Sequence, residues 1–331
     1  MLLPGQDPAA IQAAAQRLAD GELLGLPTET VYGLAARADR DEAVAKIFAA
    51  KGRPADHPLI VHVLDTAGAE PFAEHLPDTA RRLMDAFWPG PLTVIVPRRA
   101  GVAEAAAGGQ ATVGLRAPSH PVARAVLSAA RALGVAGVAA PSANRFGRVS
   151  PTLAQHVIDE FEPGLMVLDG GACDVGIESS IVDCSREHPA LLRPGLLSRE
   201  RLEAALGEPL RAPDAAAPKA SGTLAAHYAP RARVRLLASD ALAARLAVGA
   251  AAGALQGLAV YSRAQFPSAQ AAWRWQPMPA DPAAAAHELF AVLRALDAEG
   301  VREIWVEAPP VHPAWDGVRD RLSRAAAAFS D

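Results

Sequence analysis

Lysine and arginine side chains stand beside predicted strand ends, where they can bind anions. Lys51 and Arg53 lie in the stretch KGRPADHPLIVHV (51–63), in which two prolines stiffen the backbone between a helix and a strand. Arg116 ends a predicted strand, and Arg193 lies in the stretch LLRPG. Arginine presents a planar fork to a carboxylate or phosphate, whereas lysine presents a point charge. These cations are the side-chain types that hold a polyphosphate and a carboxylate.

Hydroxyl and amide side chains occupy other loops at predicted strand ends. They lie in the stretches PTETVYG, APSANRFGRVSP and DGGACDVGIESS, as Thr28, Ser142, Asn144, Ser150 and Ser179. In open α/β sheets, ligands bind beyond the strand ends because backbone donors converge there. The pair Ser150-Pro151 is also typical of a helix start, and a helix N-terminus would add N–H donors and a positive dipole end.

Each of these residues taken alone also fits a purely structural role. A histidine in an apolar strand, such as His62, is more often a hydrogen-bonded core residue than a ligand, and Arg116 at a strand end more often forms a surface ion pair. Lys51 and Arg53 also fit a solvated face, and the paired glycines of DGGACDVG are typical of a turn. Several such residues on separate loops of one domain favour a binding site for an anionic ligand.

The sequence lacks the motifs of several common enzyme classes. It contains no G-x-x-x-x-G-K-[ST] phosphate loop and no G-x-G-x-x-G dinucleotide loop. It also contains no G-x-S-x-G nucleophile elbow and no H-E-x-x-H zinc helix, and its nine histidines show no metal-ligand spacing. No side chain stands out as a covalent nucleophile, which disfavours these classes.

Composition and charge narrow the class of protein further. Of the 331 residues, 51% are hydrophobic and 21% are charged, which is typical of a soluble globular protein with room for two domains. The net charge of −4 argues against nucleic-acid binding over the whole surface. Cys173 and Cys184 are expected to be reduced, which predicts a cytoplasmic protein. No secretory leader is expected, and the most apolar run (246–261) is too short to span a membrane.

Hydrophobic periodicity predicts the elements that must position these residues. Helices are predicted over 8–20, 41–51, 78–87, 120–132 and 151–160, and strands over 23–27, 59–63, 92–96, 113–116, 137–140, 165–169 and 180–184. Because helices and strands are mixed without strict alternation, the pattern predicts an α/β domain with a mixed parallel and antiparallel sheet.

A proline-rich stretch divides the chain. Residues 207–232 contain four prolines and show no hydrophobic periodicity, which is typical of a linker. After it, strands over 234–238, 257–261 and 303–307 and helices over 239–250, 282–298 and 315–328 predict a small Rossmann-like domain. The predicted organisation is an N-terminal domain (1–206), a linker (207–232) and a C-terminal domain (233–331).

A series of short stretches carries a family resemblance. They are PTETVYGLAA, KGRP-x-x-HPLIVHV, FWPGPLT, VGLRAPSHP, APSAN with SPT, LDGG with GIESSIVD, LLRPG and HYAP. In this order they resemble the YrdC-like L-threonylcarbamoyladenylate synthase family in its two-domain form, densely over residues 10–230. The resemblance implies an open twisted mixed sheet with a concave positive face as the catalytic domain, then a linker that acts as an active-site lid and a small Rossmann-like domain.

The resemblance also implies an activity. The family joins L-threonine, bicarbonate and ATP into threonylcarbamoyl-AMP and releases pyrophosphate, and Mg²⁺ is expected with the ATP. A separate tRNA threonylcarbamoyl transferase complex then passes the group to tRNA, so tRNA would be a partner only indirectly, and no membrane is involved. Lys51 and Arg53 would act electrostatically, because the reaction needs no covalent nucleophile.

The family's binding residues carry over to matching positions of this sequence. Threonine would be bound by Thr28, His62, Arg116, Ser179 and the backbone at Ala140. ATP would be bound by Lys51, Arg53, Thr112, Ser142, Asn144, Ser150, Arg193 and Tyr228, the last folding back over the nucleotide from the linker. Ser180 stands where the family pattern has threonine, and it keeps a hydroxyl.

Two other functions fit parts of the pattern. One is an RNA-binding or ribosome-assembly module that uses the same basic face, although the acidic pI and the scarcity of aromatic side chains for base stacking count against it. The other is carbamoyl-adenylate chemistry that starts from carbamoyl phosphate, which the absence of acylphosphatase and zinc-finger segments disfavours.

Overall fold

The protein forms two compact units. The computed structural model describes residues 1–266 and 273–329. The first unit comprises Met1–Phe146 and Ser150–Thr223, and the second comprises Gly147–Val149 and Leu224–Asp331. The chain therefore passes from the first unit to the second for the last time after Thr223, which lies inside the stretch predicted to be a linker.

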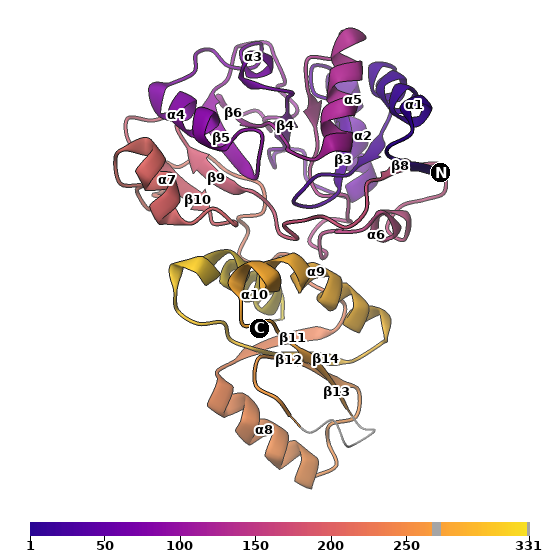
Figure 1. Cartoon of the computed structure of the whole chain (residues 1–331), viewed down its shortest axis with the longest axis vertical. Helices are drawn as coiled ribbons and strands as arrows, with labels where there is room; N and C mark the ends of the chain where they lie inside the picture. Colours follow the sequence, from indigo (N-terminus) through magenta and orange to yellow (C-terminus); the bar gives the residue numbers. More distant parts are fainter. Residues whose placement is uncertain (267–272, 330–331) are drawn as a thin grey trace. The chain divides into compact units, whose positions relative to one another are not determined.

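The first unit is built on one ten-stranded sheet (Figure 1). Its strand order is β1-β8-β2-β3-β7-β4-β6-β5-β9-β10. β4 pairs with β6 and β5 with β9 in parallel, whereas β3 with β7, β4 with β7, β5 with β6 and β9 with β10 are antiparallel. The predicted mixed sheet is therefore confirmed. The strands are β1 (Leu2–Pro4), β2 (Leu24–Leu26), β3 (Gly33–Arg37), β4 (Ile60–His62), β5 (Leu92–Pro97), β6 (Thr112–Arg116), β7 (Val138–Ala139), β8 (Met166–Asp169), β9 (Ser180–Asp183) and β10 (Ala190–Arg193).

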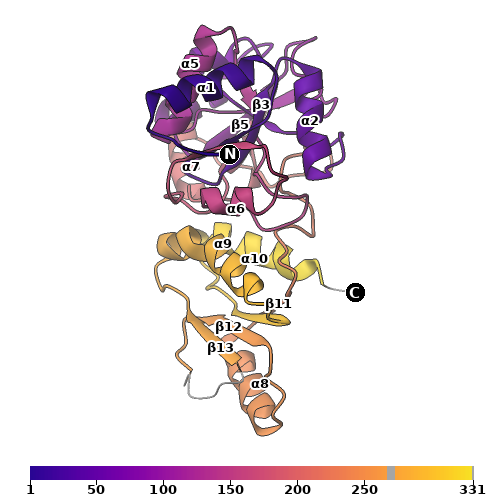
Figure 2. The ribbon, with the colours of Figure 1, turned by 90° about the vertical axis from the view of Figure 1, so that its right-hand side faces the viewer.

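Helices of the first unit cover the two faces of this sheet differently. They are α1 (Pro8–Ala19), α2 (Asp41–Lys51), α3 (Thr66–Ala69), α4 (Asp78–Phe87), α5 (Pro121–Ala132), α6 (Ala154–Ile158) and α7 (Arg199–Leu206). One core cluster joins α2, α4 and α7 to one face, and another joins α1 and α5 to the opposite face. Figure 2 shows α1 and α5 together on one side of the first unit and α2 on the other.

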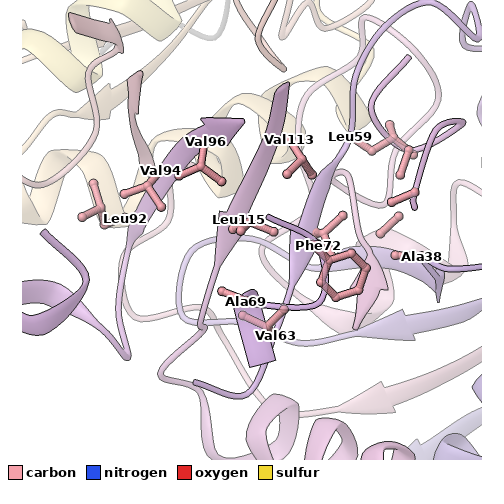
Figure 3. Packing of buried hydrophobic residues seen from close by; sticks show 14 of the residues in the cluster. Ala38, Leu59, Val63, Ala69, Phe72, Leu92, Val94, Val96, Val113 and Leu115 are labelled. Carbon is pink, nitrogen blue, oxygen red and sulfur yellow. The ribbon is translucent and has the colours of Figure 1, made fainter. Parts of the chain in front are cut away.

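Side chains along the central strands point alternately to the two faces of the sheet, and only one of these faces is filled by the core beneath α2 and α4. Leu92, Val94 and Val96 of β5, with Val113 and Leu115 of β6, enter the cluster beneath α2 and α4 (Figure 3). Because successive strand side chains point to opposite faces, the residues between these apolar positions lie on the other face. α1 and α5 pack there on β1, β8, β2 and β7. The β4, β6, β5 and β9 portion instead carries the polar side chains of His62, Thr93 and Arg116 beside a small apolar cluster that includes Ile95 and Ile181.

Several elements of the first unit differ from those expected. β1, β3, β10, α3 and α7 were not predicted, because each is short or lies in a stretch that reads as a polar loop. The helix predicted over 151–160 is confined to Ala154–Ile158, and its N-cap is Leu153 rather than Ser150. The extended backbone at Leu153 starts the helix three residues late, so the predicted helix N-terminus at Ser150 is wrong.

The second unit is a small parallel α/β layer. Its strands β11 (Arg233–Leu237), β12 (Leu258–Ser262), β13 (Trp273–Pro277) and β14 (Glu303–Glu307) are all parallel, in the order β11-β14-β12-β13. α8 (Ser239–Ala251) covers one face, and α9 (Pro282–Ala298) and α10 (Asp316–Ala327) cover the other (Figure 1). A 3-10 helix, η1 (Pro313–Trp315), precedes α10. β13 was not predicted, because its sequence WRWQP lacks an apolar run.

Two expectations from composition can be compared with the described residues. None of the helices there combines the length and apolarity that crossing a bilayer requires. Cys173 and Cys184 are both free and buried, as expected for reduced structural thiols. Burial raises the pKa of the Cys184 thiol to about 12, so it has little thiolate character at neutral pH.

Candidate active site

Parallel pairing of β4 and β6 brings two of the predicted ligands together. His62 and Arg116 are direct partners in this ladder, each as the last residue of its strand. Alternation places both on the face opposite Val61 and Leu115, which belong to the core. Both side chains are buried, with 3% of each residue exposed. The structure therefore places them side by side on the polar part of the sheet.

Arg116 is held by the loop that follows β2. Its Nη2 lies 2.8 Å from Oε1 of Glu29, and its Nη1 donates a hydrogen bond of 2.8 Å to Oγ1 of Thr30. Thr30 in turn lies 3.0 Å from the hydroxyl of Thr28, which donates to the carbonyl of Val31. Arg116 therefore forms a buried ion pair rather than a surface one, and the carboxylate comes from the same PTETVYG stretch that supplies Thr28.

Burial and charge set the protonation of this group of side chains. Desolvation, followed by the nearby Arg116 cation, lowers the pKa of His62 to about 3, and the imidazole is therefore neutral at physiological pH. For Glu29, burial acts to raise the pKa, but the Arg116 charge, the Arg116 hydrogen bond and the backbone N–H groups of Glu29 and Ser119 together outweigh it, and the pKa is lowered. We call Thr28, Glu29, Thr30, His62 and Arg116 the Arg116 cluster.

Lys51 anchors a second group of predicted ligands. Lys51 is the last residue of α2. It is followed by Gly52 in the left-handed conformation (φ 62°), which ends the helix. Its Nζ donates to the carbonyl of Ser142 at 2.5 Å and to that of Asn144. Burial, followed by the neighbouring Arg53 charge, lowers the pKa of Lys51 well below its ordinary value. We call Lys51, Arg53, Ser142 and Asn144 the Lys51 cluster.

Two further cations that were predicted to bind ATP, Arg53 and Arg193, donate to backbone oxygens. Arg53 donates to the carbonyl of Pro58 at 2.9 Å and lies 3.4 Å from the hydroxyl of Ser221. Arg193 donates to the carbonyl of Ser221 at 2.8 Å and, with two nitrogens, to the carbonyl of Ser179. Ser221 of the predicted linker therefore contacts two residues that were predicted to bind ATP.

The segment around Ser221 closes over Thr112, another predicted ATP ligand. Thr112 lines a cavity of about 20 Å³ together with Gln110, Lys219 and Ser221. Lys219 is held there by hydrogen bonds between its backbone and the Gln110 side chain, at 2.8 and 3.2 Å. The cavity holds about one water molecule, so a nucleoside at Thr112 requires this segment to move.

Ser179 and Ser150 have polar partners inside the first unit. The Ser179 hydroxyl lies 2.8 Å from Oγ1 of Thr93 on β5, on the same face as His62 and Arg116. The Ser150 hydroxyl donates a 2.5 Å hydrogen bond to Oε1 of Glu178. Ala140, the residue after β7, donates its N–H to the carbonyl of Ile60 and so sits beside β4.

Tyr228 is the one predicted site residue that belongs to the second unit. Tyr228 is buried and has a positive φ of 60°. Its ring stacks on that of Phe290, and its ring centroid lies 5.4 Å from the guanidinium carbon of Arg321. Within the same unit, Ala229 donates to the carbonyl of Gly147, and Arg294 donates to that of Val149. Its predicted contact with a nucleotide stays a prediction.

Sequence reasoning missed several residues that contact the predicted binding residues. Glu29, Thr30, Thr93, Glu178 and Ser221 each contact a predicted ligand through a side-chain atom. For Glu29 a signal existed, because an acid between two threonines directly after a buried strand is an unusual loop. For the others only the pairing of distant segments reveals the contact.

A protein-held metal does not fit the described part of the chain. Across residues 1–266 and 273–329, no group of three His, Cys, Asp or Glu side chains is arranged to hold an ion. Any Mg²⁺ would therefore have to be coordinated largely by phosphate oxygens and water.

Two family models match the chain. The model of Sua5, YciO and YrdC proteins, described as telomere recombination, matches residues 16–195. The model described as threonylcarbamoyl-AMP synthase, C-terminal domain, matches residues 197–327.

Curated relatives carry the name threonylcarbamoyl-AMP synthase. The Pyrococcus abyssi protein is 42% identical, over 68% of this chain and 66% of its own length. The Bacillus subtilis protein is 41% identical, over 70% of this chain and 67% of its own length. The Schizosaccharomyces pombe protein is 33% identical over 98% of this chain and 90% of its own.

Solved structures of P. abyssi Sua5 are also similar. A double variant of that protein has a TM-score of 0.88 and 32% identity, covering 99% of this chain and 96% of the other. The same protein complexed with L-threonine has a TM-score of 0.86 and 33% identity, covering 96% and 94%.

Proposed function

This chain belongs to the family of Sua5, YciO and YrdC proteins and carries the C-terminal domain of threonylcarbamoyl-AMP synthases, and we propose that it condenses L-threonine, bicarbonate and ATP into threonylcarbamoyl-AMP. One observation carries the proposal. A buried arginine suited to a carboxylate and a set of cations suited to a polyphosphate lie in one unit, on loops and strand ends of one sheet. This arrangement suits a reaction that joins an amino acid to a nucleotide.

The amino-acid end of the site is the Arg116 cluster. Arg116 forks the threonine carboxylate, because its guanidinium presents parallel N–H donors in a buried setting. His62 is a neutral imidazole there and can accept or donate a hydrogen bond without adding charge. Thr28 and Ser179 offer hydroxyls, and the backbone at Ala140 lies next to β4. The complex of a similar protein with L-threonine supports this choice of substrate.

The phosphate end is the Lys51 cluster with Thr112, Ser150 and Arg193. Lys51 and Arg53 balance the charge of the triphosphate when they exchange backbone carbonyls for phosphate oxygens. This exchange also favours the charged form of Lys51, whose pKa burial lowers in the absence of an anion. Mg²⁺ enters with ATP as part of the substrate.

The chemistry then needs positioning and charge stabilisation only. The threonine nitrogen forms a bond to the carbon of bicarbonate or CO₂, which gives N-carboxy-threonine. An oxygen of this carbamate attacks the α-phosphorus in line, the bond to the β-phosphate breaks, and pyrophosphate leaves. The enzyme is thus a nucleotidyltransferase. Orienting the reactants contributes on the order of 7–11 kcal/mol.

The product defines the downstream partner. A labile carbamoyl-adenylate must be protected from water and consumed by a transferase that carries the group to tRNA, so the protein acts in the cytoplasm and meets tRNA indirectly. The linker segment at Ser221 would shield the phosphate end, and its contacts with Arg53 and Arg193 support this role. An RNA-binding module is disfavoured, because Lys51, Arg53, Arg116 and Arg193 are all buried rather than displayed on a surface.

Measurement of pyrophosphate release tests the proposal. Release is expected only when threonine, bicarbonate and ATP are all present, together with a product of the mass of threonylcarbamoyl-AMP. Equal release without threonine, or ATP hydrolysis to ADP, would contradict it.

A further inference from the structure

Glu29 is a buried carboxylate that the reaction described above does not use. Only 4% of the residue is exposed, and Oε1 lies 2.8 Å from Nη2 of Arg116. Burial acts to raise its pKa, and Arg116 together with the nearby N–H groups of Glu29 and Ser119 lowers it. Yet neither carboxylate oxygen receives a hydrogen bond of good geometry from a donor in the described part of the chain. Its oxygens therefore retain capacity to accept a donor.

The substrate brings a group that needs such an acceptor. An amino acid binds as a zwitterion, and burying its ammonium without a partner is costly. The side chains assigned to threonine are Thr28, Ser179, a neutral His62 and Arg116, which offer two hydroxyls, one uncharged ring and one cation. Glu29 is the carboxylate that contacts this set, through Arg116. The Glu29–Arg116 pair has the complementary charges of the zwitterion.

We propose that Glu29 binds the α-amino group of the amino-acid substrate and accepts the proton that this group loses on carboxylation. The inference rests on the proposed function and adds a catalytic residue to it. In the free protein Glu29 pairs with Arg116. When the substrate binds, its carboxylate accepts hydrogen bonds from Arg116. Its ammonium donates hydrogen bonds to the carboxylate oxygens of Glu29.

The proton balance of carboxylation gives Glu29 its second role. The ammonium carries three N–H protons, of which one stays on nitrogen in the carbamate. As the N–C bond forms, a C–O bond of bicarbonate breaks and the departing hydroxyl leaves as water with the second proton. The third goes to Glu29. Burial raises the pKa of Glu29 and so favours the protonated acid, whereas Arg116 lowers this pKa. The effect of Arg116 weakens once its guanidinium also binds the substrate carboxylate.

A purely structural role for Glu29 makes a different prediction. If it served only as the counter-ion of Arg116, its removal would lower stability and weaken every carboxylate ligand alike. An amino-group site instead discriminates between ligands that have the amino group and ligands that lack it. The decisive quantity is therefore a ratio of affinities.

Calorimetry without ATP or bicarbonate measures that ratio. The probes are L-threonine and 3-hydroxybutyrate, which is threonine without its amino group. We expect the wild-type protein to prefer threonine at least about tenfold, since a hydrogen bond to a charged group contributes roughly 1.5–3 kcal/mol. In Glu29→Gln the ratio should fall toward one. An unchanged ratio in Glu29→Gln would overturn the proposal and assign the amino group to backbone carbonyls.

Asp183→Asn is the matched control. Asp183 is also a fully buried carboxylate paired with an arginine, at 2.9 Å from Nε of Arg186, and its other partner is Ser185. It belongs to neither cluster, so its variant should keep the wild-type ratio. A ratio that falls equally in Asp183→Asn would show a general effect of removing a buried carboxylate and would contradict a specific role of Glu29.

Two further measurements keep the inference testable if Glu29→Gln folds poorly. In the wild type, threonine should bind as the ammonium, so the binding heat at pH 7 should not depend on the ionisation enthalpy of the buffer. Release of about one proton on binding would overturn the proposal. In turnover, Glu29→Asp should retain part of the roughly 10²–10⁴-fold contribution that a proton acceptor makes. If the wild type fails to make the adenylate, the proposed function fails, whereas the affinity ratio still decides the role of Glu29.

Discussion

The Arg116 cluster and the Lys51 cluster bury cations in different ways. Arg116 is paired with a carboxylate of the protein, whereas Lys51 donates to the carbonyls of Ser142 and Asn144, which are dipoles without net charge. The charge of the first cluster is thus compensated before any ligand arrives. For Lys51, an anionic ligand would add the negative charge that these carbonyls lack.

This difference suits the two proposed ligands. A zwitterion has no net charge and fits a site that is already neutral, because it can exchange partners group by group. A triphosphate carries several negative charges and fits a site in which Lys51 donates to carbonyl oxygens rather than to a carboxylate. Mutations should therefore affect stability most in the first cluster and activity most in the second.

Removal of Arg116 should give the largest effect. Arg116→Ala leaves Glu29 as a buried unpaired charge, so the free energy of unfolding should fall by about 3–5 kcal/mol. The KM for threonine should rise far more than that for ATP. Urea unfolding and steady-state kinetics measure the two effects. Arg116→Met combined with Glu29→Gln removes both charges and should recover most of the stability. A failure to recover would contradict the view that the loss comes from an unpaired buried carboxylate.

Removal of Lys51 should spare stability and reduce catalysis. Lys51→Met removes a cation whose burial is unfavourable, as its lowered pKa indicates, so the free energy of unfolding should be unchanged or higher. The kcat should fall about 10²–10³-fold, which is the effect of losing one electrostatic contact to the transition state. Lys46→Met is the control, because Lys46 lies on the same helix and its side chain is 42% exposed. A large loss of stability in Lys51→Met alone would contradict the proposed difference.

His62 should make the Arg116 cluster sensitive to acid. Its pKa is about 3 in the folded protein against 6.5 in the unfolded chain, so the unfolded state binds more protons between these values. Stability from this residue is complete above pH 6.5 and is lost as the pH falls, by at most about 1.4 kcal/mol per pH unit. Urea unfolding from pH 7 to pH 5 should show this slope, and His62→Asn should flatten it. An equal slope in the variant would assign the acid sensitivity to other groups.

The smallest effect should come from the linker at the phosphate end. Gln110→Ala removes the two hydrogen bonds that hold Lys219 and keep the cavity at Thr112 closed. Because a net hydrogen bond contributes about 0.5–1.5 kcal/mol, the KM for ATP should fall by roughly two- to tenfold, while the KM for threonine stays constant. Lys219→Ala loses only an exposed ion pair with Asp56 and should change neither. A rise in the KM for ATP would show that the closed segment helps to bind ATP.

The strands at the centre of the sheet could be predicted from sequence. The runs LIVHV, LTVIV and VGLR are short apolar stretches between turn residues, and they correspond to β4, β5 and β6. Lys51 was also placed correctly at a helix end, because Gly52 is a strong stop signal. These features depend on local periodicity, which the sequence displays directly.

Pairings between distant segments could not be predicted in the same way. The Glu29–Arg116 contact depends on how the loop after β2 meets the end of β6, and no local pattern encodes that meeting. The contacts of Ser221 with Arg53 and Arg193 depend on the path of an aperiodic linker. Ser150 was misjudged for the opposite reason, since the local Ser-Pro signal was strong but the backbone stays extended until Leu153.

The two-residue alternation of β4, β5 and β6 has a consequence for how this protein can evolve. Deletion or insertion of one residue within β6 would exchange the faces of Leu115 and Arg116, burying the guanidinium among Val94 and Phe72 and turning an apolar side chain toward the substrate. A point substitution changes one side chain, whereas a one-residue shift of register moves every binding side chain of the strand to the opposite face. Tolerated changes of chain length should therefore be confined to the loops outside these strands, and a library of single-residue deletions would display the site as a block of inactive clones.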